Sequence, residues 1–215
     1  ILTEVINQPE NHFGYGHSSG HVSGKVIDFH PTIEVEVSYR DGKQNIKTAL
    51  LGDFNLYNIL CAATVGDIFQ IESEKISKSL QNYSPSNHRS QLIKTNTNTV
   101  IADCYNANPT STLAALKSLS SMKVENKLAI LGDMLELGEN EVVEHQNIVQ
   151  FLLEKNIKGI LVGNVFSNLK CNFPTFDKVD FILPYLKNMK YENYTILIKG
   201  SRGVKLEKII ENQIL

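Results

Sequence analysis

The sequence predicts an α/β fold, with a Rossmann-like domain built on a mainly parallel sheet and preceded by a smaller β-rich piece. In the second half, short apolar runs bounded by turn residues alternate with segments of helical spacing, which is typical of βαβ crossovers. In the first third, apolar and polar residues alternate one by one, as in half-buried strands. The 215 residues, of which 42% are hydrophobic, can form one large core or two small ones.

The β-rich piece is predicted from one alternating run and one turn. Residues 32–40 place apolar side chains on one face and polar side chains on the other. The dipeptide Asp41-Gly42 follows, and it predicts a hairpin into a second strand over residues 44–49, because a tight hairpin needs positive φ at its turn. Residues 55–69 then change to helical spacing. We expect this helix to close the first unit.

A polar stretch without periodicity, residues 81–87, separates this piece from the rest of the chain. It contains a proline, and such a segment is typical of a linker between compact units. We therefore predict two domains, residues 1–84 and residues 85–215.

Strands and helices alternate in the second domain. Four short apolar runs predict buried strands, and the segments between and after them carry apolar residues at helical spacing. The strands are expected at residues 100–102, 128–131, 160–162 and 196–198, and the helices around Leu113, Leu116 and Leu119, around Val142, Ile148, Val149 and Leu152, around Val179, Ile182, Leu183 and Leu186, and around Leu206, Ile209 and Ile210.

Composition argues against several classes of protein. The formal net charge of -2 gives no excess positive field for nucleic-acid binding. No apolar stretch approaches the roughly 20 residues of a membrane span. The three cysteines, Cys61, Cys104 and Cys171, suit neither a disulfide framework nor a metal knuckle, so we expect a cytoplasmic protein without a metal site of its own.

The turn after the first strand of the second domain carries polar side chains where ligands bind in open α/β sheets, beyond the carboxyl end of a strand. Asp103 could accept hydrogen bonds from ribose hydroxyls, and Asn106 and Asn108 offer donors and acceptors to a polar substrate. The alternative is structural, because asparagine followed by Pro109 is a good start for a helix.

Two further turns are expected at the same edge of the sheet. Asp133 and Glu136 could receive an ammonium group or shape the site around a metal-bound nucleotide, unless they form only a solvated acidic loop. Lys199 and Arg202 bring two cations, and Arg202 can bind the carboxylate of a small peptide through two parallel hydrogen bonds. The alternative for this pair is a basic loop that offsets a helix terminus.

Arg89 and His145 lie outside these turns. Arg89, just after the linker, could reach a nucleotide phosphate, as an arginine finger does, or be an ordinary surface arginine. His145 lies on a predicted helix and is interpreted as structural.

The strings DCYNANPTS, LGDMLELGE and LIKGSRG, in this order and at strand ends, resemble the Mur ligase family. The resemblance covers about residues 51–203 and, more weakly, the β-rich start. It implies that residues 1–84 are part of a central, ATP-binding domain and that residues 85–215 form the C-terminal domain. Within residues 52–58 the sequence is similar to the family's G-x-(H/F/Y)-N-x-x-N helix start, which implies that Asn55 and Asn58 face the adenine of ATP.

The resemblance also implies roles for residues of the second domain. Arg89 would lie near the ATP phosphates and Asp103 would bind the ribose, in a nucleotide cleft between domains. No catalytic residue is assigned. The substrate-binding region would be lined by Tyr105, Asn106, Asn108, Asp133, Glu136, Lys199, Ser201 and Arg202.

The activity implied by the resemblance is ATP-dependent amide formation in peptidoglycan precursor synthesis. The branch of the family most similar to these strings adds D-alanyl-D-alanine to UDP-N-acetylmuramoyl-tripeptide through an acyl phosphate, as a monomer that uses Mg²⁺. The chain contains no G-x-x-x-x-G-K-(S/T) loop, so we expect the phosphate-binding lysine and the Mg²⁺ ligands upstream of Ile1 and no activity from this chain alone. The alternatives are another Mur or folylpolyglutamate-type ligase, or a non-catalytic module that binds a nucleotide or peptide.

Overall fold

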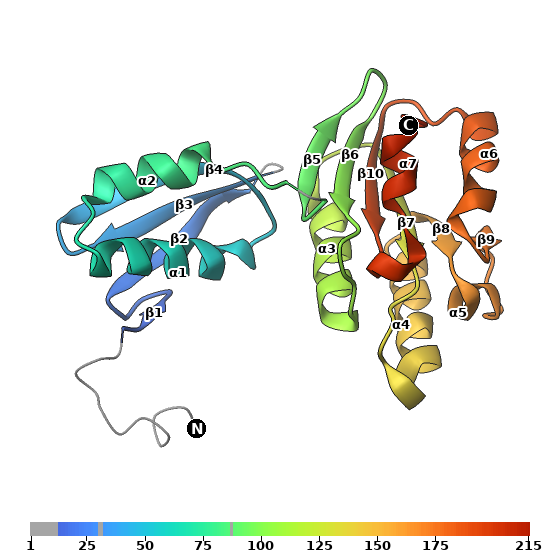
Figure 1. Cartoon of the computed structure of the whole chain (residues 1–215), viewed down its shortest axis with the longest axis horizontal. Helices are drawn as coiled ribbons and strands as arrows, with labels where there is room; N and C mark the ends of the chain where they lie inside the picture. The colour runs from blue at the N-terminus through green and yellow to red at the C-terminus, as the bar shows by residue number, and fades with distance from the viewer. Residues whose placement is uncertain (1–12, 30–31, 87) are drawn as a thin grey trace. The chain divides into compact units, whose positions relative to one another are not determined.

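The structure is a computed structural model that describes residues 13–29, 32–86 and 88–215. The chain divides into two compact units, Ile1–Ser84 and Pro85–Leu215, and each is described by itself (Figure 1). Of the residues in the expected linker, Gln81 and Asn82 belong to a helix instead, and Asn87 lies outside the described residues. Within the described ranges, no helix is long and apolar enough to cross a membrane.

The first unit places two helices on a four-stranded sheet of order β1-β2-β3-β4 (Figure 1). Strands β2 to β4 are antiparallel to one another, and the short β1 runs parallel to β2. The expected hairpin forms with Tyr39 opposite Gly42, so that its turn is Arg40-Asp41, one residue earlier than predicted. The elements are β1 Tyr15–Gly16, β2 Val22–Phe29, β3 Thr32–Tyr39, β4 Gly42–Leu51, α1 Asn55–Ile68 and α2 Ser73–Asn82.

The core of this unit lies between the sheet and α1. Alternate residues of β3 are buried, and they pack together with Leu56, Ile59 and Leu60 of the helix. Helix α2 was not predicted, because its sequence SEKISKSLQN offers only Ile76 and Leu80 as apolar residues. Both pack on the core from one face of the helix, at i, i+4 spacing, so tertiary contacts stabilise a helix whose two apolar residues are too few for a clear sequence signal.

The second unit has a six-stranded sheet of order β5-β6-β10-β7-β8-β9. All neighbouring strands are parallel except β5 and β6, which form an antiparallel pair at one edge. The four predicted strands are present, each longer than predicted by two or three residues, and β5 and β9 were not predicted. The strands are β5 Gln91–Lys94, β6 Thr99–Asp103, β7 Asn126–Gly132, β8 Lys158–Val162, β9 Thr175–Phe176 and β10 Tyr194–Lys199.

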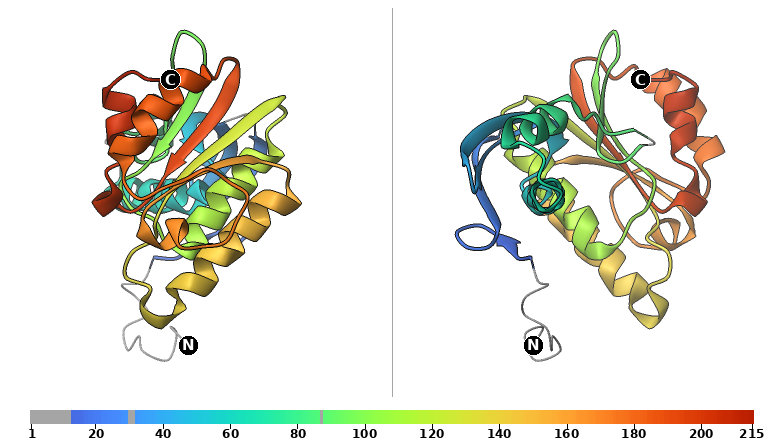
Figure 2. Two further views of the ribbon diagram at one scale, coloured as in Figure 1. Left: turned by 90° about the vertical axis from the view of Figure 1, so that its right-hand side faces the viewer. Right: turned by 60° about the vertical axis from the view of Figure 1, so that its left-hand side comes forward.

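Helices cover both faces of this sheet, as Figure 2 shows, with α3 and α4 on one face and α6 and α7 on the other. The central strands are therefore buried on both faces, which explains their continuous apolar runs. The expected fold class is confirmed. The helices are α3 Pro109–Ser121, α4 Glu141–Glu154, α5 Asn164–Ser167, α6 Val179–Met189 and α7 Glu207–Glu211, with short 3-10 turns at Gly138–Asn140 and Arg202–Val204.

Candidate functional site

The candidate site lies at the carboxyl ends of β6, β10 and β7, which are neighbours in the sheet. Lys199, the last residue of β10, is paired with Asp103 on one side and with Leu131 on the other. The loops that follow the three strands therefore start at the same level of one edge. In open α/β sheets this edge is where ligands bind.

Ser201 joins the three loops. Its N–H donates to the carbonyl of Asp133 (3.1 Å), and its hydroxyl accepts from the N–H of Leu135 (2.9 Å) and donates to the carbonyl of Ala107 (3.4 Å). The side chain is buried, with a relative exposure of 5%. Ser201, expected to touch the substrate, instead fixes the backbone of the segments that could touch it.

Lys199 and Asp103 form a buried ion pair beneath this edge. The ammonium group of Lys199 donates to Asp103 Oδ2 (2.6 Å) and to the carbonyl of Asn106 (3.1 Å), and the lysine side chain is 2% exposed. The other oxygen of Asp103, Oδ1, accepts from the N–H (2.9 Å) and the hydroxyl of Ser90. Lys199 is thus a positioning residue, while Asp103, 20% exposed, keeps some acceptor capacity at the surface.

Two arginines meet on one exposed aromatic ring. The guanidinium of Arg89 lies 3.8 Å from the ring centre of Tyr105, and that of Arg202 lies 5.5 Å from it. The hydrogen bond from Arg89, together with the positive charges of Arg89 and Arg202, lowers the pKa of the Tyr105 hydroxyl. The bond between Ser90 and Asp103 holds the chain next to Arg89, and no motif in the sequence indicates this role for Ser90. The arrangement concentrates positive charge at the surface.

Asp133 does not face a ligand. Its carboxylate accepts hydrogen bonds from the N–H groups of Val165 (2.9 Å) and Phe166 (3.0 Å), at the start of α5, and the residue is 4% exposed. Gly163 makes this contact possible, since a Cβ there would lie 2.2 Å from Asp133 Cγ. The carboxylate is turned toward the protein, so this geometry gives no support to the expected contact with a substrate ammonium group.

His145 has the structural role expected of it. Its Nε2 accepts from the N–H of Met134 (2.9 Å), and its Nδ1 lies 2.6 Å from the carbonyl of Glu141. Because a carbonyl can only accept, Nδ1 carries the proton and the ring is the neutral tautomer. The fully buried ring thereby holds the second loop against α4.

The remaining predicted residues of this edge fall into two groups. Asn108 caps α3: its side chain accepts from the N–H of Ser111 in a reciprocal capping box, as the structural alternative predicted. Asn106 and Glu136 are exposed, and Glu136 has a left-handed backbone with φ of 67°. Of the two predicted carboxylates in the second loop, only Glu136 is placed to meet a ligand.

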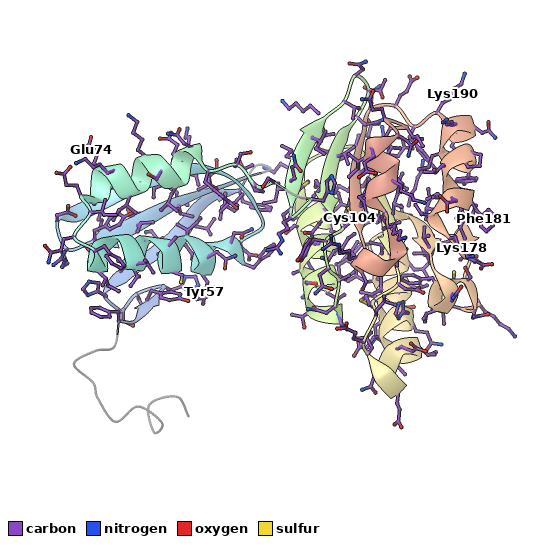
Figure 3. All side chains as sticks on the ribbon, in the orientation of Figure 1. Tyr57, Glu74, Cys104, Lys178, Phe181 and Lys190 are labelled. Carbon is purple, nitrogen blue, oxygen red and sulfur yellow. The ribbon has the colours of Figure 1, made fainter. Side chains whose placement is uncertain are left out.

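Cys104 lies next to Asp103 but is not available for chemistry (Figure 3). It is 2% exposed, and burial raises the pKa of its thiol to about 12. Nor does any group of three or more metal-binding side chains (His, Cys, Asp or Glu) gather within the described part of the chain.

In the first unit, Asn55 and Asn58 lie on the first turn of α1. The Asn55 side chain is buried and donates to the carbonyl of Leu51 (2.7 Å), and it accepts from the amide of Asn58 (2.8 Å). Asn58 is exposed. Asn55 thus fixes the start of the helix and orients Asn58, which is the member of the pair that can reach a ligand.

Residues 88–202, more than half of the chain, match the model of the family described as Mur ligase, glutamate ligase domain. The chain belongs to the Mur ligase family. The match spans the loops that converge on Ser201 as well as Arg89 and Arg202.

Two relatives of this Mur ligase chain have the same name. The UDP-N-acetylmuramoyl-tripeptide--D-alanyl-D-alanine ligase of Rickettsia prowazekii is 29% identical over 94% of the chain and 47% of its own length. The ligase of the same name from Buchnera aphidicola is 34% identical over 81% of the chain and 39% of its own length. The chain thus spans between two fifths and one half of the length of these relatives.

Solved Mur ligase structures share the fold. A crystal structure of MurF from Acinetobacter baumannii superposes with a TM-score of 0.84 at 24% identity, covering 94% of this chain and 47% of that one. A crystal structure of MurF from Thermotoga maritima in complex with ADP gives a TM-score of 0.78 at 19% identity, covering 94% of this chain and 48% of that one.

Proposed function

We propose that this chain is part of an ATP-dependent ligase that adds D-alanyl-D-alanine to UDP-N-acetylmuramoyl-tripeptide, and that it supplies the site for the dipeptide. The observation that carries this proposal is the pair of exposed guanidinium groups, Arg89 and Arg202, held on Tyr105 where three loops converge. The substrate class is that of the relatives, which are named UDP-N-acetylmuramoyl-tripeptide--D-alanyl-D-alanine ligases.

The reaction proposed for the whole ligase explains why cations are needed at this edge. A tripeptide carboxylate oxygen attacks the γ-phosphorus of ATP and ADP leaves, which gives an acyl phosphate. The dipeptide amine then attacks the acyl carbon, loses a proton and expels inorganic phosphate. Both steps concentrate negative charge on phosphoryl and carbonyl oxygens, and positioned guanidinium groups stabilise such charge.

We assign different ligands to the exposed residues at this edge of the sheet. Arg202 binds the dipeptide carboxylate through two parallel hydrogen bonds, and Glu136 receives its ammonium group. Arg89 meets phosphoryl oxygens. Asp103 and Asn106, at the surface beside them, contribute polar contacts to the ribose and the substrate.

ATP would also contact the first unit. We propose that Asn58, oriented by Asn55, recognises the adenine, because an amide side chain offers both a donor and an acceptor to the base edge. Mg²⁺ would neutralise the phosphates. The 215 residues contain no G-x-x-x-x-G-K-(S/T) loop, and we propose that Arg89 is only one of the phosphate-binding groups of the ligase, whose phosphate-binding lysine is not among these residues.

A titration of the chain with D-alanyl-D-alanine tests the dipeptide site. Binding is measured from the chemical shifts of the backbone amides. We expect shifts in the loops after β6, β7 and β10. Arg202→Gln should weaken binding roughly tenfold or more, because a hydrogen bond to a charged group is lost. Lys205→Gln is the matched control, since Lys205 is a neighbouring exposed cation without a recorded contact to Tyr105. If the unmodified chain does not bind the dipeptide, the assignment fails.

A phosphate-release assay tests whether this chain alone has the groups needed for phosphoryl transfer. With ATP, Mg²⁺, D-alanyl-D-alanine and UDP-N-acetylmuramoyl-tripeptide, the chain alone should release no phosphate above background. Release that depends on both amide partners would show that these residues suffice for phosphoryl transfer, and it would contradict the proposal.

A further inference from the structure

Leu135 is an exposed leucine among the polar groups of the candidate site. It follows the buried Met134 and precedes the exposed Glu136, and it is 46% exposed. Single exposed leucines are common on protein surfaces, so exposure alone assigns no role. Its position is informative, because a Cβ built on Gly203 would lie 2.9 Å from Leu135 Cδ1. The leucine side chain therefore lies against the residue that follows Arg202.

The backbone around Leu135 is fixed on both sides. Its own N–H donates to Ser201 Oγ (2.9 Å), and the preceding N–H, that of Met134, donates to the buried ring of His145. The next residue, Glu136, has φ of 67°. Each of these constraints limits how the backbone of the loop can relax, so the Cα of Leu135 is held beside Gly203.

The edge thus offers a cation and an apolar group side by side. Arg202, on the face of Tyr105, can hold a carboxylate. Leu135, in the loop after β7, offers methyl groups beside Gly203, the residue that follows Arg202. A ligand that satisfies both groups carries a carboxylate next to a short aliphatic side chain. The carboxyl-terminal residue of an alanyl peptide has this chemistry.

We propose that Leu135 contacts the methyl group of the carboxyl-terminal alanine while Arg202 binds its carboxylate, so that Leu135 sets the preference for alanine over glycine at that position. This inference rests on the proposed function, which places the dipeptide at this edge. Gly203 is part of the same subsite, because any side chain there would displace the leucine.

The test compares D-alanyl-D-alanine with D-alanyl-glycine, using chemical-shift titrations of the whole chain. The unmodified chain should bind D-alanyl-D-alanine about three to ten times more tightly, the usual effect of one buried methyl group. Leu135→Ala should bring this ratio close to one while changing the affinity for D-alanyl-glycine by less than about twofold. Leu135→Met should keep most of the preference.

Leu153→Ala is the matched control, since Leu153 is an equally exposed leucine (51%) near the far end of α4. It should leave both affinities unchanged. A Leu135→Ala variant that keeps the original ratio, or that weakens both ligands equally with a folded amide spectrum, would overturn the inference and leave the dipeptide site standing. Failure of the unmodified chain to bind either peptide would instead refute the proposed function.

Discussion

At the scale of single residues, Lys199 and Asp103 depend on each other unequally. The lysine is 2% exposed, and its ammonium group has only the carboxylate of Asp103 as a counter-charge among its recorded partners. The aspartate is 20% exposed and also accepts two hydrogen bonds from Ser90. Removing the aspartate charge therefore leaves a buried cation uncompensated, whereas removing the lysine leaves a carboxylate that donors and water still solvate.

We predict that Asp103→Asn lowers the free energy of unfolding by about 2–4 kcal/mol and Lys199→Met by less than about 1.5 kcal/mol. Urea denaturation of both variants at neutral pH measures the difference. Arg40→Gln, in the other unit, is a control for the loss of an ion pair with a buried carboxylate, that of Asp67. Equal losses for Asp103→Asn and Lys199→Met would show that the lysine is not buried as described.

The sequence located the residues of this edge better than it predicted their roles. Asp103, Asp133 and Lys199 are predicted from their places at strand ends, and Ser201 from the family resemblance. Whether each faces a ligand or the protein depends on partners far away in the sequence, such as the N–H groups at the start of α5, which hold Asp133. Asn108 is the exception, because the partner of its side chain lies three residues away and the cap can be read locally.

At the scale of elements, the junction between β8 and α5 depends on Gly163. Its φ of 130° and ψ of 168° belong to a region that residues with a side chain rarely adopt. Here the added Cβ would also collide with the carboxylate of Asp133. Because Gly163 has no side chain, β8 can lead directly into α5 while Asp133, from the loop after β7, contacts the first N–H groups of that helix.

Replacement of Gly163 by alanine should lower the free energy of unfolding by about 3 kcal/mol, because backbone strain and the collision add. Thermal and urea unfolding provide the measurement. Gly138→Ala is the control, since Gly138 also has a positive φ (57°) but no atom within 4 Å of an added Cβ, and it should cost only about 1 kcal/mol. A smaller loss at Gly163 than at Gly138 would contradict this account.

Elements with a strong pattern of their own were predicted, and those stabilised by neighbours were not. The strands around residues 100–102 and 196–198 are apolar because helices cover both faces, and this leaves a clear signal. β5 is a half-buried edge strand of four residues, Gln91–Lys94, and α5 has a single turn held by Asp133. Neither element is long enough for its sequence to show a hydrophobic periodicity.

At the scale of the whole molecule, the outward side of α1 is unusual for a surface. Its exposed residues include Tyr57, Val65 and Ile68, and Phe69 follows with an exposure of 75%. The only charged residue of the helix is Asp67, which is buried and paired with His21 and Arg40. A solvent-facing helix normally carries charge on its outer side, as α2 does (Figure 3).

We therefore expect the chain to self-associate weakly through α1. Sedimentation measured over a range of concentrations should show a dimer whose dissociation constant rises about tenfold or more in the double variant Val65→Lys, Phe69→Lys. Phe181→Lys is the control, because Phe181 is 58% exposed on α6 in the other unit. A monomer at every concentration, or equal effects of both changes, would contradict this role for the helix.

The position of β10 has a consequence for synthesis on the ribosome. The strand completed last lies between two that emerge much earlier, β6 and β7, so a nascent second unit holds a gap in the middle of its sheet until Tyr194–Lys199 leaves the exit tunnel. The first unit, made entirely of earlier residues, can fold meanwhile. Because Lys199 and Arg202 are synthesised with that final strand, the edges of β6 and β7 lack a partner for as long as the proposed dipeptide site is incomplete.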